Sequence, residues 1–203
     1  MYARIFIPSA FVILIILAGP SFGFVSESLC IYGGDFNLSI PAEPGNSKGW
    51  MADAIVDVPD EHIIFDLDVV ISLMHSNVFD LQIFLQGPNG QRICLNMYDS
   101  FDKFFVGEDY RQTIFDDEAQ IAIEHGQVPF VGRFRPMAGN ELSVFDGQYS
   151  QGLWRLQIYD AFYFDTGTLD SFELMITNPE PATAVLFVLG SALMLTFRPS
   201  YKG

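Results

Sequence analysis

The sequence has few cations. Ten Lys and Arg residues stand against 25 Asp and Glu residues, for a formal net charge of −15. Such a chain repels phosphate backbones and anionic lipid surfaces through its long-range field, which excludes nucleic-acid binding. An acidic surface suits divalent cations, neutral sugars or basic partners instead.

The residue patterns of common hydrolases are also absent. None of the three histidines, His62, His75 and His125, lies near a serine in a strained turn, and the chain contains no G-x-S-x-G run. It has no zinc-type spacing of His or Cys and no glycine-rich phosphate loop. A Ser–His–Asp triad assembles in space, so spacing alone does not exclude one. We nevertheless expect a protein without catalytic residues that is not an enzyme.

Cysteine is scarce as well, with Cys30 and Cys94 as the two residues of this type. In an exported protein two cysteines suggest one disulfide. Closing the loop between them would stabilise the fold by roughly 4 kcal/mol in the chain-entropy view. The alternative is a pair of separate buried thiols.

The N-terminus has the pattern of a secretory signal peptide. Arg4 precedes a largely apolar run from Ile5 to Leu17, and small residues follow up to Gly23. The run is shorter than the roughly 20 apolar residues of a transmembrane span, although an uncleaved anchor is the alternative. We predict a signal peptide over residues 1–23, followed by an N-terminal extension over 24–51.

The C-terminal segment, residues 178–203, contains a second apolar run from Ala182 to Phe197, followed by Arg198 and Lys202. As a helix it would be slightly short for a bilayer core at about 1.5 Å per residue. Basic residues after the run favour a cytoplasmic C-terminus and an exported domain. We expect a hydrophobic helix here that anchors the chain to a membrane, at least transiently.

Residues 52–177 alternate apolar and polar side chains, the period of half-buried strands. Turns rich in Gly, Pro and Asp separate the runs, and no helical stripe with caps occurs between them. This pattern predicts an all-β domain, an antiparallel jelly-roll β-sandwich. The expected strands lie at residues 65–73, 81–85, 92–97, 120–124, 129–135, 141–145, 154–158 and 172–176.

Acidic residues gather at two expected loops. Calcium takes six to eight oxygen ligands on irregular backbone, so loops at one end of a sandwich could converge to bind it. The alternative is a set of solvated turn residues. The predicted metal ligands are Asp116, Asp117, Glu118, Asp160 and Asp165.

The loop Phe162, Tyr163 and Phe164 places three aromatic rings in a row. Exposed rings could stack on sugars, which makes this loop a candidate ligand-binding platform. Trp154 is in phase with Leu156 and Ile158, and it is therefore expected in the core.

Several motifs resemble the P domain that follows the subtilisin-like catalytic domain in kexin and furin. The resemblance begins with a strand ending at His75 and the stretch Asp80–Gly90, and it continues in order to about residue 177. Similar motifs occupy residues 115–119, 129–136, 142–147, 152–160 and 165–174. The resemblance implies a jelly roll that stabilises a serine endopeptidase and tunes its calcium and pH dependence. No subtilisin-like domain accompanies it here, so we expect no proteolysis by this chain itself.

The tail resembles a PEP-CTERM sorting signal, with the motif Pro179, Glu180 and Pro181 before the apolar run and Arg198 after it. The resemblance implies processing by an exosortase-type enzyme and delivery to the cell envelope or extracellular matrix. A plain single-span anchor is the alternative.

Three functional hypotheses follow from these observations. The first is an exported structural or interaction module, stiffened by calcium, in the envelope or matrix. The second is a carbohydrate-binding module that recognises exopolysaccharide. The third is an accessory domain that acts in trans on a separate subtilisin-like protease.

Overall fold

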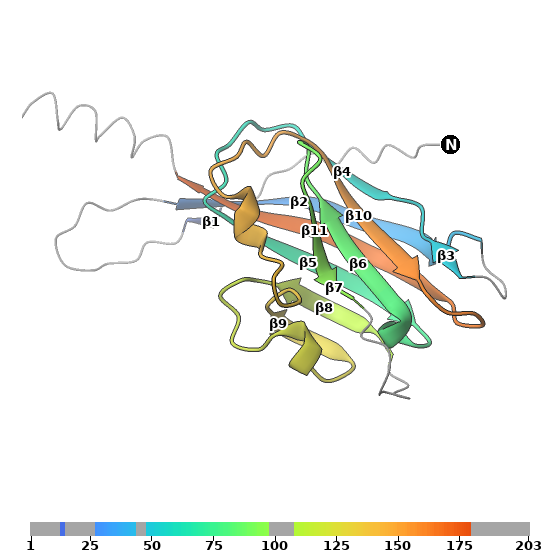
Figure 1. Ribbon diagram of the computed structural model, residues 1–203. Coiled ribbons are helices and arrows are strands. Elements are labelled where there is room, and N and C mark those ends of the chain that lie inside the picture. The colour runs from blue at the N-terminus through green and yellow to red at the C-terminus, as the bar shows by residue number, and fades with distance from the viewer. Residues whose placement is uncertain (1–12, 15–26, 44–47, 98–107, 180–203) are drawn as a thin grey trace, which may run out of the picture.

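The computed structural model describes residues 13–14, 27–43, 48–97 and 108–179, and these form two β-sheets that Figure 1 shows as two layers. Short 3-10 turns connect some of the strands: η1 (Val78–Asp80), η2 (Ile123–His125) and η3 (Leu142–Phe145). The prediction of an all-β sandwich is confirmed.

The larger sheet has six strands in the order β1-β2-β11-β5-β8-β9. Neighbouring strands run antiparallel except β8 and β9, which are parallel. The expectation of a fully antiparallel sandwich is therefore wrong at this edge. The strands are β1 (Ile13–Leu14), β2 (Glu27–Ile40), β5 (Asp66–His75), β8 (Tyr110–Phe115), β9 (Phe130–Phe134) and β11 (Gly167–Pro179).

The smaller sheet has five strands, with β10 (Gly152–Asp160) at its centre. One edge of β10 pairs with β6 (Leu81–Gln86), which in turn pairs with β7 (Arg92–Asn96). The other edge pairs first with β4 (Ala54–Val58) and then with β3 (Gly49–Trp50). Two short strands thus share one side of β10.

The core lies between the two sheets, and alternation along the strands fills it. Trp154 and Ile158 of β10 are fully buried, as are Phe172 and Leu174 of β11. The indole N–H of Trp154 donates to the carbonyl of Ser150 at 2.8 Å, which satisfies its polar atom. Each such side chain contributes about 1.5–3 kcal/mol through burial of its apolar surface. The prediction that Trp154 belongs to the core is confirmed.

The prediction of a strand is wrong for two segments. Residues 120–124 make a single bridge at Ala122 before turning into η2, and residues 141–145 form η3. Ile123, Leu142 and Phe145 are nevertheless buried. Alternation predicted correctly which side chains enter the core, but a 3-10 turn can bury the same residues without a strand partner.

Strand β2 lies within the stretch that we expected to be an extension before the sandwich. It pairs with β11 from Glu27 to Ile40. Gly33 lies against β11 with φ of +135°, and an added Cβ atom would come within 2.1 Å of the Phe172 carbonyl oxygen. Only glycine accepts both this conformation and this approach. Residues 27–40 are therefore an integral part of the larger sheet.

The expected disulfide is not formed. Cys30 lies in β2 of the larger sheet and Cys94 in β7 of the smaller one, and both are buried free thiols. Burial raises the pKa of the Cys94 thiol to about 11. The two cysteines therefore act as small core side chains.

Much of the two terminal segments lies outside the described residues. The signal peptide falls there except for Ile13–Leu14, and so do the apolar tail and Glu180, Pro181 and Arg198 of the sorting motif. Pro179 is the last residue of β11. In the part of the chain that the structure describes, no helix is long and apolar enough to cross a membrane.

Candidate functional site

One end of the sandwich gathers a buried imidazole and several carboxylates. His75 ends β5 and Asp160 ends β10, so the two sheets bring these residues together. The Nε2 atom of His75 lies 3.5 Å from Oδ2 of Asp160, and neither side chain has any exposed surface. The backbone N–H of Phe162 donates to the other Asp160 oxygen at 3.1 Å. We call this arrangement, together with Ser76, Asp80 and Asp165, the His75 cluster.

The His75 cluster has the His–Asp pair of a catalytic triad but not its nucleophile. The Nδ1 atom of His75 lies 2.9 Å from the carbonyl oxygen of Asn77, and its Nε2 atom faces Asp160. The neighbouring Ser76 hydroxyl donates instead to Asp165 Oδ1 at 2.8 Å. A triad needs a hydroxyl that donates to the imidazole. In the residues described here, no serine makes that bond.

Asp80 in η1 adds a second carboxylate pair to the His75 cluster. Burial, a hydrogen bond with Asp165 and the negative charges of Asp165 and Asp160 raise the pKa of Asp80 to about 7. Two carboxylates this close share a proton because both cannot ionise at low cost. Sequence analysis missed Asp80, since a lone Asp at the end of a short turn is common.

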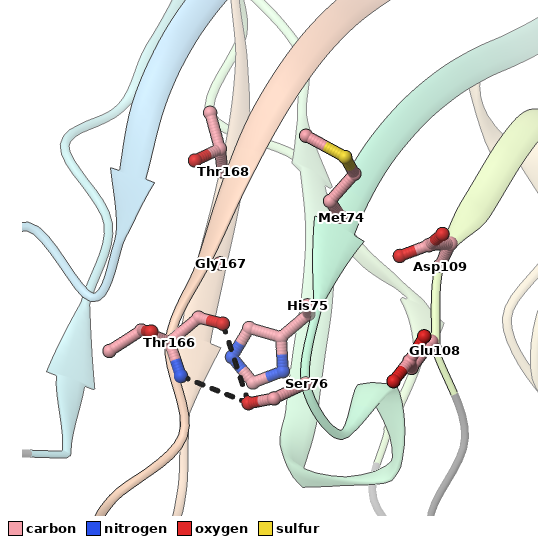
Figure 2. Close-up of a pocket in the computed structure, with 8 residues that line it drawn as sticks. All are labelled: Met74, His75, Ser76, Glu108, Asp109, Thr166, Gly167 and Thr168. Atoms are coloured by element: carbon pink, nitrogen blue, oxygen red, sulfur yellow. Dashed lines mark hydrogen bonds between the residues drawn. The ribbon is translucent and has the colours of Figure 1, made fainter.

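A hollow of about 430 Å³ opens beside the His75 cluster. Figure 2 shows Glu108 and Asp109 across it from His75 and Ser76, with β11 along one side. The backbone of Gly167 passes so close to His75 that an added Cβ atom would lie 2.5 Å from the imidazole Cδ2. Carboxylates and hydroxyls among the lining residues make the hollow acidic and polar. The imidazole ring is buried beneath it. Its lining residues are Met74, His75, Ser76, Glu108, Asp109, Thr166, Gly167 and Thr168.

The opposite end of β5 holds a separate acidic group. The Nη1 atom of Arg133 in β9 donates to Asp68 Oδ2 at 2.8 Å and to Asp116 Oδ2 at 2.6 Å. Burial raises the pKa of Asp68 to about 6 in spite of Arg133. Burial also disfavours ionisation of Asp116, but the bonds from Arg133 and the Glu118 N–H outweigh it and lower that pKa. Arg133 therefore joins two buried carboxylates in an ionic triad.

The five predicted calcium ligands do not converge. Asp116, Asp117 and Glu118 lie near Asp68, whereas Asp160 and Asp165 lie near His75. His75 lies seven positions after Asp68 along β5, roughly 23 Å at about 3.3 Å per residue. Among the residues whose positions are described, no three His, Cys, Asp or Glu side chains are arranged to hold a metal ion.

Donors of the chain already occupy the oxygens of the first group. Asp117 accepts from the backbone N–H groups of Leu142 and Ser143 at 2.9 and 2.8 Å, and so holds the start of η3. Asp116 accepts from Arg133 and Glu118. These residues do not fit a calcium site, because a cation would have to displace those donors. Calcium binding by Asp160 and Asp165 stays a prediction.

The predicted aromatic loop connects β10 to β11 beside the His75 cluster. Tyr163 and Phe164 are exposed, with ring centroids 6.3 Å apart, and Phe164 is 77% exposed at φ of +78°. The Lys48 ammonium lies 5.5 Å from the Tyr163 ring centroid. The loop is accessible, and its binding role stays a prediction.

Sequence analysis missed a second group of rings on the smaller sheet. Trp50 of β3 lies 4.9 Å from Tyr159 of β10 and 6.1 Å from Phe84 of β6, between ring centroids. The guanidinium of Arg92 lies over Phe84 at 3.8 Å. We call these four side chains the aromatic platform. The signal was present in the outward positions of the strands, where Phe84 and Tyr159 alternate with glutamines.

The sequence model of the proprotein convertase P-domain matches residues 64–176, more than half of the chain. The chain belongs to this family. P domains are accessory domains of subtilisin-like proteases and do not carry the catalytic residues. The match runs from just before β5 into β11, so the His75 cluster, the ionic triad and the aromatic loop all lie within the P domain.

Two solved structures are similar to the chain along about a quarter of their own length. The serine protease of Aeromonas sobria in complex with a chaperone is 21% identical, over 75% of this chain and 27% of that one, at a TM-score of 0.46. The same protease alone is 19% identical, over 74% and 27%, at a TM-score of 0.42. No curated protein matches the chain. Assignment to the P-domain family therefore rests on the sequence match.

Proposed function

We propose that the chain is an exported, non-catalytic accessory module that acts beside a separate subtilisin-like protease in the cell envelope or extracellular matrix. The observation that carries the proposal is a P-domain match in which the buried His–Asp pair has no serine partner among the described residues. The imidazole and the Asp160 carboxylate lie buried between two strand ends, which supports a structural role for the pair and a role for the fold in contact with another protein.

Export and sorting are part of the same proposal. The apolar run after Arg4 and the Pro179-Glu180-Pro181 motif before a second apolar run support it. An exosortase-type enzyme would process the tail. Until it is processed, or if it is not processed, the tail would anchor the module to the membrane. A module held there would act on a protease of the same compartment.

Fluorophosphonate labelling tests the catalytic part of this proposal. The reagent reacts with activated serines, and we expect no label on the purified chain because no described serine is bonded to an imidazole. Stoichiometric labelling of a serine would overturn the non-catalytic assignment.

Co-purification tests the partner. The tagged full chain, recovered from the envelope fraction of its own cells, should bring with it a second protein that the same reagent labels and that mass spectrometry identifies as subtilisin-like. Recovery of the chain without any labelled hydrolase, at protein levels where the protease is detectable in the same fraction, would overturn the action in trans.

A further inference from the structure

The aromatic platform lies on the outer face of the smaller sheet. Its strand neighbours Ile83, Leu85 and Ile158 are fully buried, and alternation therefore turns Phe84 and Tyr159 to the opposite side. Trp50 opposes Tyr159 in the β3–β10 register and is 48% exposed. An indole half open to solvent beside two other rings is an unusual surface, since large aromatic side chains are mostly buried.

The polar side chains around the aromatic platform are amides rather than carboxylates. The outward positions of β6 carry Gln82 and Gln86 on either side of Phe84, and Gln157 lies between Arg155 and Tyr159 on β10. None of these outward positions is acidic, in a chain with 25 Asp and Glu residues. A carboxylate lies toward β4, where Asp53 contacts Arg155 at 3.7 Å and accepts from the Gln157 amide at 3.3 and 3.4 Å.

Two arginines also lie on the smaller sheet. The described residues include six Lys and Arg side chains, of which Arg92 belongs to the aromatic platform, Arg155 lies on β10 at 3.7 Å from Asp53, and Lys48 lies over the Tyr163 ring of the aromatic loop. The others are engaged elsewhere: Arg111 with Asp109, Arg133 in the ionic triad, and Arg135 with the backbone carbonyls of Ala119 and Gln120. Of the two described arginines on the smaller sheet, Arg92 is thus the one without an ion-pair partner among the described residues.

Arg92 is positioned to bind a carboxylate. Its guanidinium lies over the Phe84 ring at 3.8 Å and 5.4 Å from the Trp50 ring centroid, and no salt bridge to it exists among the described residues. Stacking engages the flat face of the group and leaves its N–H edges able to donate two parallel bonds to one carboxylate. The rings hold the side chain in place, which lowers the entropy lost on binding.

We propose that the aromatic platform binds an acidic polysaccharide of the polyuronate class. The apolar C–H faces of pyranose rings pack on Trp50 and Tyr159, the glutamine amides bond the hydroxyls, and Arg92 binds a uronate carboxylate. The unpaired charge of Arg92 complements one uronate carboxylate, whereas the net charge of −15 opposes any purely electrostatic attraction of an anionic chain. Recognition therefore needs the rings and the arginine together. This inference does not depend on the proposed protease partner.

Affinity electrophoresis of the full chain tests the proposal, with polygalacturonate or neutral dextran in the gel. We expect polygalacturonate, but not dextran, to retard the protein. Trp50→Ala and Arg92→Gln should each weaken this binding at least about tenfold, which corresponds to about 1.4 kcal/mol. Two controls should bind as the unmodified chain does: Tyr149→Ala, an exposed aromatic in the segment before β10, and Arg111→Gln, an exposed cation on the other sheet.

Three results would overturn the proposal: no retardation by polygalacturonate, equal retardation by dextran, or binding that survives both platform variants. Circular dichroism tests whether each variant is folded. If Trp50→Ala is not folded, the binding of Arg92→Gln to polygalacturonate decides the outcome. Sedimentation that shows self-association lost in Trp50→Ala, without polysaccharide binding, would assign the surface to a second copy of the chain instead.

Discussion

The imidazole of His75 and the carboxylate of Asp160 face each other with no exposed surface, one at the end of β5 and the other at the end of β10. The pair therefore links the two sheets at one end of the sandwich. Neither His75 Nε2 nor Asp160 Oδ2 has a hydrogen-bond partner within the described part of the chain, so removal of one group leaves the other buried atom without the opposing polar group that it faces, and such a loss is costly.

Replacement of Asp160 by Ala should accordingly lower the free energy of unfolding by about 3 kcal/mol at pH 7. Urea denaturation followed by tryptophan fluorescence measures this change. Asp57→Ala is the matched control, because Asp57 is exposed on β4, and it should change stability by less than about 0.5 kcal/mol. Equal effects of the two substitutions would mean that the pair does not hold the sheets together.

Stability should fall as the pH rises from about 4 to 8. The folded-state pKa of Asp80 is about 7, and those of Asp68 and Asp146 are about 6, all above the ordinary value of 3.8. Because the folded state holds these protons more tightly, their contribution is present below pH 3.8 and is lost as the pH passes the folded pKa values. Thermal melts at pH 5 and pH 8 should differ by several degrees, with the higher melting temperature at pH 5.

Asp80→Asn tests which groups cause the change of stability with pH, called the slope below. The amide does not ionise, so the variant should lose less stability than the unmodified chain between pH 5 and pH 8. Asp57→Asn serves as the control and should leave the slope unchanged. A slope identical in all three proteins would assign the pH dependence to other groups.

Loss of Arg133 should destabilise the larger sheet. Arg133→Gln removes the charge that faces both Asp68 and Asp116, and Asp68 Oδ1 is already buried without a partner. We expect a loss of about 2 kcal/mol at pH 7, less than for a fully buried pair because Arg133 is half exposed. Urea denaturation of Arg133→Gln beside Arg111→Gln measures it. Stability unchanged in both would show that the ionic triad is energetically neutral.

An added methyl group at Gly33 should disrupt the contact between β2 and β11. Gly33→Ala forces a side chain against the Phe172 carbonyl in a backbone conformation that alanine disfavours, and it should cost at least about 2 kcal/mol. At Gly49 the nearest neighbour of an added Cβ is Pro41 at 3.6 Å, so Gly49→Ala is the control. Equal melting temperatures for the two variants would contradict the tight packing of β2.

The strands with strict alternation could be predicted from the sequence, and the others could not. β10 follows the pattern of Trp154, Leu156 and Ile158, which are buried as expected. β2 was missed because Gly33 and Gly34 interrupt its apolar pattern, and Gly33 is required for the close contact with β11. Ile123 and Phe145 enter the core from 3-10 turns, which alternation does not distinguish from short strands.

Sequence motifs predicted the candidate sites poorly, because the tertiary structure decides which residues come together. Asp116 and Asp160 are both acidic loop residues by sequence, but the length of β5 keeps them apart. His75 and Asp160 are 85 positions apart in the chain and meet only because β5 and β10 end at the same side of the sandwich. The rings of Trp50 and Tyr159 likewise come together through strand register, which local patterns do not specify.

The register of β2 and β11 pairs Glu27 with Pro179 and Ile40 with Gly167. The polypeptide consequently enters and leaves the sandwich at one pole, while the Tyr163 loop and the hollow over Ser76 lie at the other. With about 3.3 Å per residue over β11, the two poles stand roughly 40 Å apart. A tether attached at either Glu27 or Pro179 would therefore leave the loops of the opposite pole pointing away from the support.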